Sequence, residues 1–387
     1  MIQIGYKRKI LVKIIDFIFF VFYLPFLLFK KKTHQSLENS RKILVLELWG
    51  IGDLVMASSA LKSLRKAFPG ATITVLAKDY ARDLLKEEGV VDFFVAFEFP
   101  WTRHKGKYNF WTWDLSGLFK IIAFLRRKKF DLAIDARMDF RNNLLLALIN
   151  AKRRIGYSLT GGGFFLTDKV DSPKQVMHRV DAWVDLLKFM SIDIENINPK
   201  LTVSLKEKEW AENFLLSKGV SKGDFVAGIH PGAGVKKRCW PLDRFKETAK
   251  YLFSKYSIKS LLFIEPNGYG QEIDDSELFV MVRPNLRELL ALISVCDLFL
   301  CNDGGPMHMA TALGPWTVAI FGPGNLDIVK PLGVKNRVII KEGFSCRPCR
   351  DYCRYAQARC LTSIETEEVE KVLDEVISGN NLYNKKY

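Results

Sequence analysis

An Asn-Asp-Gly-Gly turn between an apolar strand and a helix is the feature of this chain best suited to chemistry. Residues 297–301 read as the strand, and a helix is expected from Pro306 onward. Such a turn aims free backbone N–H groups and the positive end of a helix dipole at one point, which suits a phosphate. Our first candidates for phosphate binding are therefore Asp303, Gly304, Gly305, Pro306, Met307 and His308.

Two further glycine-containing junctions follow apolar strands. One carries Gly232, Ala233 and Gly234 and is followed by a basic run in which Lys237 and Arg238 could neutralise a diphosphate. The other, near the start of the chain, carries Gly50 and Gly52 and ends at Asp53, whose carboxylate could point into a cleft because it lies where the strand gives way to its helix. Three such junctions in two α/β halves indicate an enzyme that handles a nucleotide-linked substrate.

Each candidate also has a plain structural interpretation. Asp53 could simply offset the dipole of its helix, and Asp303 could close an Asx turn, as an Asp before Gly commonly does. A single helical histidine such as His308 is often structural, and the basic run at 236–238 could be a solvated surface.

Strands and helices alternate on both sides of these junctions. The pattern predicts parallel sheets covered by helices, in two doubly wound domains with ligand sites at the carboxyl ends of the strands. A short polar stretch at 191–200 reads as the linker. The expected strands are 43–48, 72–77, 93–97, 130–135, 225–230, 260–264, 297–301 and 316–321; the expected helices are 53–68, 81–88, 115–128, 142–149, 176–190, 242–256, 286–295, 306–313 and 361–377.

The chain is strongly basic, with 58 Lys and Arg against 43 Asp and Glu, a net charge of +15 over 387 residues. This charge favours an anionic partner, namely nucleic acid, an anionic membrane or a phosphorylated substrate. No nucleic-acid-binding module matches, so we expect no nucleic-acid partner. Basic runs at 126–129 and 152–154 would suit an acceptor that carries phosphates or acidic sugars, or they could be solvated faces.

Four of the seven cysteines cluster near the C-terminus. Their spacing, Cys346-x2-Cys349-x3-Cys353-x6-Cys360, could hold a metal, although it fits no standard zinc or iron–sulfur pattern well. The alternatives are a loop with reduced thiols or a local disulfide.

The first forty residues form a separate segment. Residues 10–29 are almost wholly apolar and are flanked by basic residues, but Asp16 and Pro25 argue against a straight membrane span. A removed signal peptide would need a small-residue cleavage site after the apolar segment, and the sequence has none there, so we do not expect one. We expect a monotopic anchor in the cytoplasmic leaflet, with an apolar helix packed on the protein itself as the alternative.

The ordered set of motifs resembles glycosyltransferase family nine, the ADP-heptose:lipopolysaccharide heptosyltransferases. The similarity covers residues 41–375. It is carried by the strand and turn at 43–53 with the helix at 60–66, by 230–234 through Trp240-Pro241, by Asn302-Asp303-x-Gly305-Pro306-Met307-His308, by Phe321-Gly322-Pro323, and by the Cys346-x-Pro348-Cys349 loop with 364–369.

The resemblance implies a GT-B architecture, with two Rossmann-like domains facing a cleft. It implies an acceptor domain at 41–195 with Gly50 and Gly52 on the acceptor side, a nucleotide-sugar domain at 196–364, and a C-terminal helix and tail at 365–387, after the membrane-associating segment at 1–40. Asp53 would be the catalytic base, and Arg238 would stand where the family has a phosphate-contacting lysine. No Asp-x-Asp motif ends a strand, so we expect no catalytic metal and no cofactor beyond an ADP-sugar donor.

The implied function is an inverting transfer of heptose from ADP-heptose to a lipid-linked lipopolysaccharide core acceptor, at the cytoplasmic face of the bacterial inner membrane. Two departures bear on the donor. Gly304 stands where the family often has Ser or Thr, and the ribose-binding acid could be Glu265 or Glu272. The alternatives are the same fold with another nucleotide-sugar or surface-glycan acceptor, or a binding protein that has lost turnover. A dinucleotide-dependent oxidoreductase fits less well, because a basic run follows Gly234 where that fingerprint needs glycine.

Overall fold

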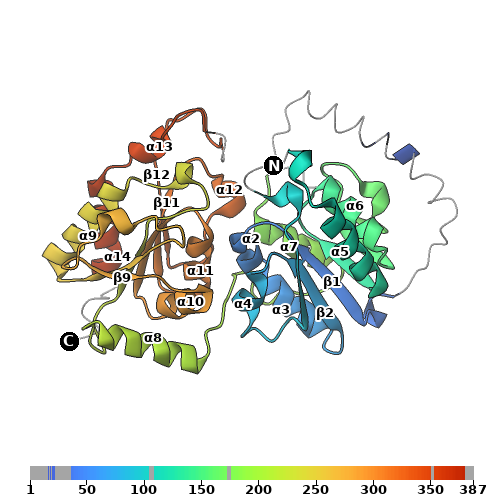
Figure 1. Ribbon diagram of the computed structural model, residues 1–387, viewed down its shortest axis with the longest axis horizontal. Helices are drawn as coiled ribbons and strands as arrows, with labels where there is room; N and C mark the ends of the chain where they lie inside the picture. The colour runs from blue at the N-terminus through green and yellow to red at the C-terminus, as the bar shows by residue number, and fades with distance from the viewer. Residues whose placement is uncertain are drawn as a thin grey trace. The chain divides into compact units, whose positions relative to one another are not determined.

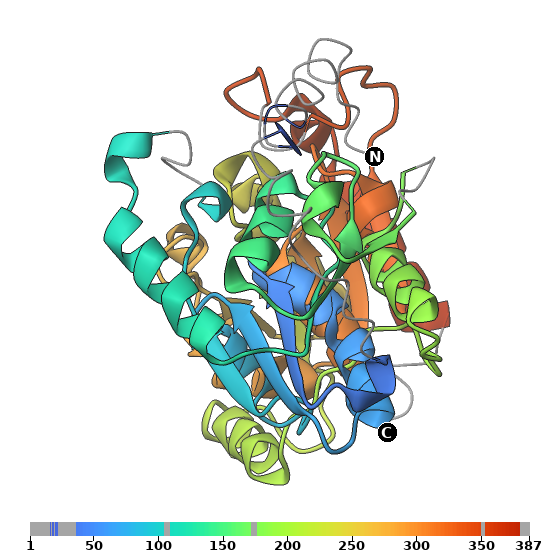
Figure 2. The ribbon, with the colours of Figure 1, turned by 90° about the vertical axis from the view of Figure 1, so that its right-hand side faces the viewer.

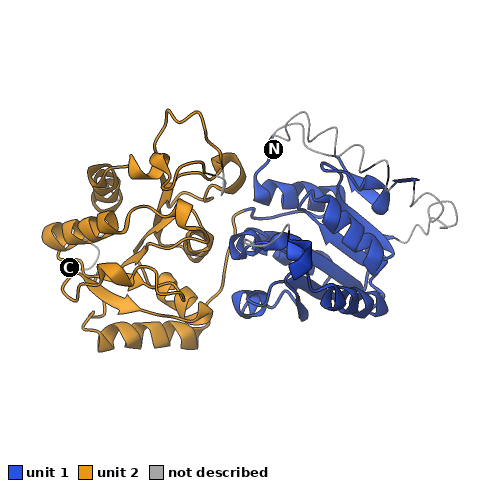
Figure 3. Ribbon diagram, turned by 45° about the horizontal axis from the view of Figure 1, so that its top comes forward, with its two compact units in different colours: residues 1–197 blue, residues 198–387 orange. Residues whose placement is uncertain are grey.

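The computed structural model describes Asp16, Ile18, Phe20, Val21 and residues 36–103, 109–171, 176–349 and 353–379. The chain divides into two compact units, residues 1–197 and 198–387 (Figure 3). Among the described residues, each unit holds a sheet of six parallel strands.

Unit 1 is built on a sheet in the order β3-β2-β1-β4-β5-β6. The central strand β1 is buried on both faces, as expected for an apolar strand in a parallel sheet. Its neighbours pair with it in register, Leu46 lying beside Asp135 on one side and Leu76 on the other. The strands are β1 (Lys42–Glu47), β2 (Thr72–Ala77), β3 (Phe93–Ala96), β4 (Leu132–Asp135), β5 (Arg153–Tyr157) and β6 (Asp168–Val170).

Helices cover both faces of this sheet (Figure 1). α5 and α6 share a core with Leu44 and Leu46, which point to one face of β1. α2 and α3 pack against α7. The helices are α2 (Ile51–Met56), α3 (Ser58–Ala67), α4 (Ala81–Leu85), α5 (Leu115–Arg127), α6 (Phe140–Ile149) and α7 (Arg179–Phe189), with 3-10 turns η1 (Leu37–Asn39), η2 (Pro100–Thr102), η3 (Phe110–Thr112) and η4 (Gly163–Phe165).

Unit 2 repeats the architecture in the order β12-β11-β10-β7-β8-β9. Its core joins α9 and α14 around Trp240, which is fully buried. The strands are β7 (Ala227–His230), β8 (Ser260–Phe263), β9 (Phe279–Val282), β10 (Leu298–Asn302), β11 (Trp316–Phe321) and β12 (Asn336–Ile340). The helices are α8 (Leu205–Ser217), α9 (Leu242–Tyr256), α10 (Leu286–Ser294), α11 (Gly305–Leu313), α12 (Leu326–Val329), α13 (Arg359–Thr362) and α14 (Thr366–Gly379), with 3-10 turns η5 (Lys236–Arg238) and η6 (Gln271–Ile273).

The predicted strands all occur with small shifts at their ends, but two helix predictions need correction. The single helix expected at 361–377 is broken into α13 and α14. The carbonyl of Ile364 lies in the break and accepts hydrogen bonds from Trp240 Nε1 and Arg244, so it is not available to a continuous helix. The helix expected from Asp53 begins at Ile51 and is interrupted at Ala57.

The sequence patterns did not identify β5, β6, β9, β12 or α8. β6 has three residues, of which only Val170 is apolar, and the apolar run of β12 is only three residues long and mostly half-buried. The basic run at 152–154 overlaps β5, and Arg154 is not a solvated residue. Its side chain is 2% exposed and donates to the carbonyls of Phe165 and Ala151.

Most of the expected N-terminal anchor lies outside the described residues. Of its described part, Asp16 accepts a hydrogen bond from the backbone N–H of Gly162, and the Phe20 ring meets that of Phe164 edge-on at 5.6 Å. These contacts are the kind that the packed-helix alternative requires. Within the described parts of the chain, no helix combines the length and the apolar character needed to cross a bilayer.

Candidate functional site

Asp53 lies in the first turn of α2, just beyond the carboxyl end of β1. Its Oδ2 accepts a hydrogen bond from the N–H of Gly50 at 3.1 Å, so it caps its own helix as the structural interpretation predicts. The side chain has a second set of partners. Its Oδ1 lies 2.5 Å from Arg137 Nη1 and 3.7 Å from Arg179 Nε, which places the carboxylate between two guanidinium groups.

The two arginines control the charge of Asp53. Burial alone would raise the pKa of this carboxyl, but the charges of Arg137 and Arg179 outweigh it and hold the pKa below its ordinary value. Arg137 is itself held in place, since its guanidinium lies 4.4 Å from the centre of the Trp49 ring. Asp53 is therefore an ionised carboxylate at neutral pH, fixed at the end of a strand.

Two further carboxyl groups end neighbouring strands of the same sheet. Glu47 ends β1, and burial followed by the nearby Asp53 charge raises its pKa to about 8. Asp135 ends β4 and accepts from Asn142 Nδ2 at 2.8 Å, yet burial raises its pKa to about 7. Glu47 Oε1 is buried and has no hydrogen-bond partner among the described residues. The carboxyl edge of this sheet thus holds one ionised carboxylate beside two acids whose pKa burial raises to near or above neutrality.

Sequence reasoning found Asp53 but missed Glu47, Asp135, Arg137 and Arg179. A signal was present for the two acids, because each ends an apolar strand. The sequence around the two arginines carried no such signal. Arg137 follows β4 in a loop and Arg179 starts α7, and only the fold brings them to Asp53.

In unit 2, one buried side chain forms hydrogen bonds that connect two of the sequence motifs. Asn302, the last residue of β10, is 1% exposed. Its Nδ2 donates to the carbonyl of Pro231 at 2.6 Å, and its Oδ1 accepts from the N–H of Trp240 at 2.9 Å. The Gly232–Gly234 turn after β7 is thereby fixed beside the Asp303–Gly304 turn after β10.

The N-terminus of α11 has the features of a phosphate site. Gly304 is its N-cap and offers no side chain to the free N–H groups, and the nearest atoms to a Cβ built there are 3.7 Å or more away. The prediction that Met307 and His308 bind the phosphate needs one refinement. The side chains of Met307 and His308 are 0% and 6% exposed, so at Met307 only the backbone could meet a ligand.

Of the basic residues after the Gly232 turn, Lys237 and Arg238 are partly buried, whereas Lys236 is exposed. Arg238 Nη1 lies 3.4 Å from Asp303 Oδ2, so the guanidinium lies beside the turn that starts α11. Lys237 instead donates to the carbonyl of Cys353. Arg238 is thus the better placed of the two to meet an anion at α11.

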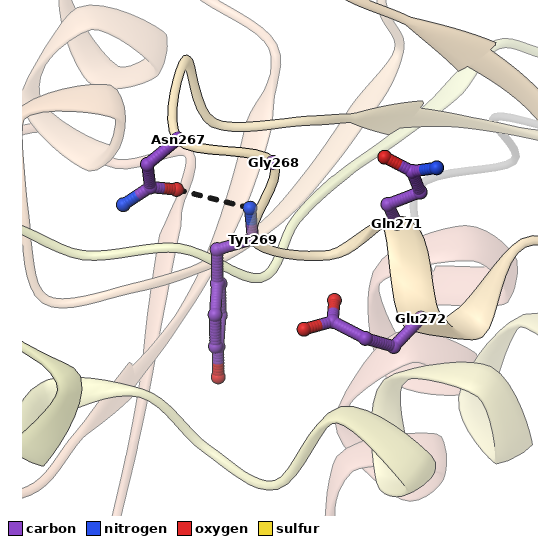
Figure 4. Close-up of a pocket in the computed structure, with 5 residues that line it drawn as sticks. All are labelled: Asn267, Gly268, Tyr269, Gln271 and Glu272. Carbon is purple, nitrogen blue, oxygen red and sulfur yellow. Dashed lines mark hydrogen bonds between the residues drawn. The ribbon is translucent and has the colours of Figure 1, made fainter.

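A cavity of about 630 Å³ lies beyond the end of β8 in unit 2 (Figure 4). It is lined by Asn267, Gly268, Tyr269, Gln271 and Glu272, and Figure 4 draws the Tyr269 ring and the Glu272 carboxylate on the same side of the loop. Glu265 stands at the other end of this loop. A Cβ at Gly232 would lie 2.2 Å from its Oε1, so Glu265 packs against the Gly232 turn.

The cysteine cluster gives a mixed picture. Burial and the neighbouring Cys353 thiol raise the pKa of Cys349 to about 11, so these two thiols lie close together. All seven cysteines are free thiols, not joined in disulfides. Among the described residues, no three His, Cys, Asp or Glu side chains are grouped in a way that could hold a metal ion.

Comparison with known proteins identifies the family of this chain. The model of the family described as glycosyltransferase family 9 (heptosyltransferase) matches residues 118–358. The lipopolysaccharide heptosyltransferase 2 of Salmonella typhimurium is 29% identical over 319 residues, which cover 77% of this chain and 87% of that protein.

Solved structures share the fold. The Escherichia coli ADP-heptose LPS heptosyltransferase II superposes with a TM-score of 0.69 at 23% identity, over 88% of this chain and 99% of that one. A glycosyltransferase family 9 protein of Veillonella parvula gives 0.71 at 23% identity, over 89% and 99%. With its two parallel six-stranded sheets and a family match over more than half its length, this chain is a glycosyltransferase and belongs to glycosyltransferase family 9, the heptosyltransferase family.

Proposed function

We propose that this enzyme transfers heptose from ADP-heptose to a lipid-linked lipopolysaccharide core acceptor, with inversion and without a catalytic metal. The observation that carries the proposal is the N-terminus of α11, with an unobstructed Gly304 and Arg238 beside it. Such a site suits the diphosphate of a nucleotide-sugar. The named heptosyltransferase relatives support heptose as the sugar and the lipopolysaccharide core as the acceptor.

The donor site that we propose lies in unit 2, in residues 196–364. The backbone N–H groups of Gly304, Gly305 and Met307 and the Arg238 guanidinium would hold the diphosphate, with Lys237 nearby. The turn at 232–234 would close over it. The cavity beyond β8 would take the nucleoside, with Glu265 or Glu272 accepting hydrogen bonds from the ribose hydroxyls.

The acceptor site that we propose lies in unit 1, in residues 41–195, at Gly50, Gly52 and Asp53. In the transfer, the acceptor hydroxyl oxygen forms a bond to the anomeric carbon, and the bond from that carbon to the diphosphate breaks. ADP leaves with the electron pair, and the hydroxyl proton passes to Asp53. The Arg137 and Arg179 charges keep Asp53 ionised but reduce its basicity. An anionic acceptor that draws these arginines away would restore it.

We place the enzyme at the cytoplasmic face of the inner membrane, as a peripheral or monotopic protein. The support is its net charge of +15, the apolar and basic character of residues 1–40, and the lipid-linked acceptor that the proposed reaction needs.

Nucleotide-dependent thermal stabilisation of the purified protein tests the donor assignment. ADP should raise the melting temperature more than UDP, GDP, CMP or NAD, and EDTA should not change the effect. A response to UDP or GDP instead would move the function to another nucleotide-sugar on the same fold. No response to any nucleotide would favour a binding protein without turnover.

A further inference from the structure

Unit 1 presents large apolar side chains to solvent along η3 and α5. Soluble proteins bury most such side chains, and a contiguous exposed group marks an interaction site. Two of these side chains are largely exposed, Trp111 at 98% and Phe119 at 70%. We call this group the α5 surface; its members are Phe110, Trp111, Leu115 and Phe119.

Packing of α5 does not account for these residues. The inner side of the helix is already apolar, since Leu125 is buried and Leu118, Ile121 and Ile122 pack against the unit 1 core. At 100° per residue, Leu115 and Phe119 lie together on a different side of the helix, one turn apart. An ordinary surface helix would be polar there. In Figure 2 the teal ribbon of η3 and α5 runs along the outside of unit 1.

Positive charge surrounds the apolar side chains. Between residues 109 and 130 there are five Lys or Arg, all exposed, and one acid that precedes them. That acid, Asp114, caps α5 by accepting from the N–H of Gly117 at 2.8 Å. The Lys128 ammonium lies 4.9 Å from the centre of the Phe124 ring. The basic residues are Lys120, Arg126, Arg127, Lys128 and Lys129.

We propose that the α5 surface docks on an anionic lipid bilayer, with Trp111 and Phe119 in the headgroup region and the basic side chains on lipid phosphates. Aromatic residues beside Lys and Arg, on a helix that lies flat, have the composition of an interfacial helix. A second copy of the chain fits less well, since a symmetric contact would place five positive charges against five. This inference extends the membrane part of the proposed function and is independent of the donor.

Tryptophan quenching by brominated lipid tests the contact on the full chain. Residues 1–40 contain no tryptophan, so their own insertion gives no signal. Anionic vesicles of brominated phosphatidylglycerol should quench the wild type, and Trp111→Phe should lose most of that quenching. Trp210→Phe, which removes a 38% exposed tryptophan from unit 2, should keep it. Equal quenching in wild type and Trp111→Phe would overturn the proposal.

Charge reversal tests the role of the basic residues. Lys120→Glu with Arg127→Glu changes the charge by four units and should weaken binding to phosphatidylglycerol vesicles on the order of a thousandfold, at about 1 kcal/mol per unit charge. The matched control, Lys218→Glu with Lys222→Glu, changes the net charge equally on exposed residues of unit 2. An equal loss of vesicle binding in the control would show that the effect comes from net charge alone and would overturn the proposal.

Two readouts distinguish lipid docking from dimerisation and from a failure of the donor site. If sedimentation shows a dimer that Phe119→Ser dissociates, and vesicle binding does not change, the surface belongs to a second copy and the lipid proposal is overturned. Stabilisation by ADP reads the donor site alone. If the wild type shows no vesicle contact but is still stabilised by ADP, this inference is rejected and the donor assignment stands.

Discussion

Replacing Glu47 by Gln should make the protein more stable, and increasingly so as the pH rises. The side chain is 6% exposed at the end of β1, and burial raises its pKa from 4.5 to about 8. Between these values the carboxyl ionises in the unfolded chain but stays protonated in the folded one. The folded state then binds more protons, so the free energy of unfolding falls as the pH rises.

The size of the effect follows from the pKa. Each pH unit in this window costs up to about 1.4 kcal/mol, so from pH 4.5 to pH 7 the loss reaches roughly 3 kcal/mol. Gln has nearly the same shape and cannot ionise. Glu47→Gln should match the wild type near pH 4.5, exceed it by roughly 3 kcal/mol at pH 7, and gain nothing further above pH 8. Asp135 is present in both proteins and its charge is one cause of the raised Glu47 pKa, so the difference measures Glu47 together with its coupling to Asp135.

Urea-induced unfolding between about pH 5 and pH 8 measures this difference. Glu98→Gln is the control, because its hydrogen bond to Lys78 lowers the pKa of Glu98, so removing that charge should act in the opposite direction. Parallel stability curves for Glu47→Gln and the wild type would refute the reasoning. They would mean that Glu47 is ionised in the folded protein and paired with an arginine.

Three further substitutions test the two proposed sites. Asp53→Asn should abolish sugar transfer while ADP still stabilises the protein, and loss of both together would mean that Asp53 is structural. Arg238→Ala should weaken ADP binding roughly tenfold or more, the usual worth of a charged hydrogen bond, as measured by calorimetry; unchanged affinity would remove Arg238 from the site. Gly304→Ser should fold with an unchanged melting temperature, because its backbone is extended and a Cβ there meets nothing closer than 3.7 Å, and it should bind ADP at least as well. Weaker ADP binding by that variant would show that the added side chain obstructs the ligand.

Much of the sheet architecture could be predicted from the sequence, because strands buried on both faces are short apolar runs. β1 and β10 are such strands, and both end at a motif residue. The edge strand β6 could not, since only one of its three residues is apolar; β12 has an apolar run at 338–340, but the run is short and only one of its residues is buried. The break between α13 and α14 was also hidden, because it depends on Trp240 and Arg244, which are more than a hundred residues away.

The candidate site divides in the same way. Asp53 and the Gly304 turn lie at strand–helix junctions, a local signal that a single sequence carries. Arg137 and Arg179 reach Asp53 from positions 84 and 126 residues further along the chain, and nothing in their own surroundings indicates it. Sequence spacing therefore predicts where a ligand-binding turn lies, whereas the charge of its key carboxylate depends on the fold.

The most direct measurement is transfer itself, with purified full-length protein, ADP-heptose and a heptose-free lipopolysaccharide core acceptor, read by mass spectrometry of the acceptor and by release of ADP. The proposed function predicts a product larger by one heptose, one ADP released for each product, no loss of rate with EDTA, and no product with Asp53→Asn. No product from ADP-heptose, with transfer from a UDP- or GDP-sugar instead, would contradict it.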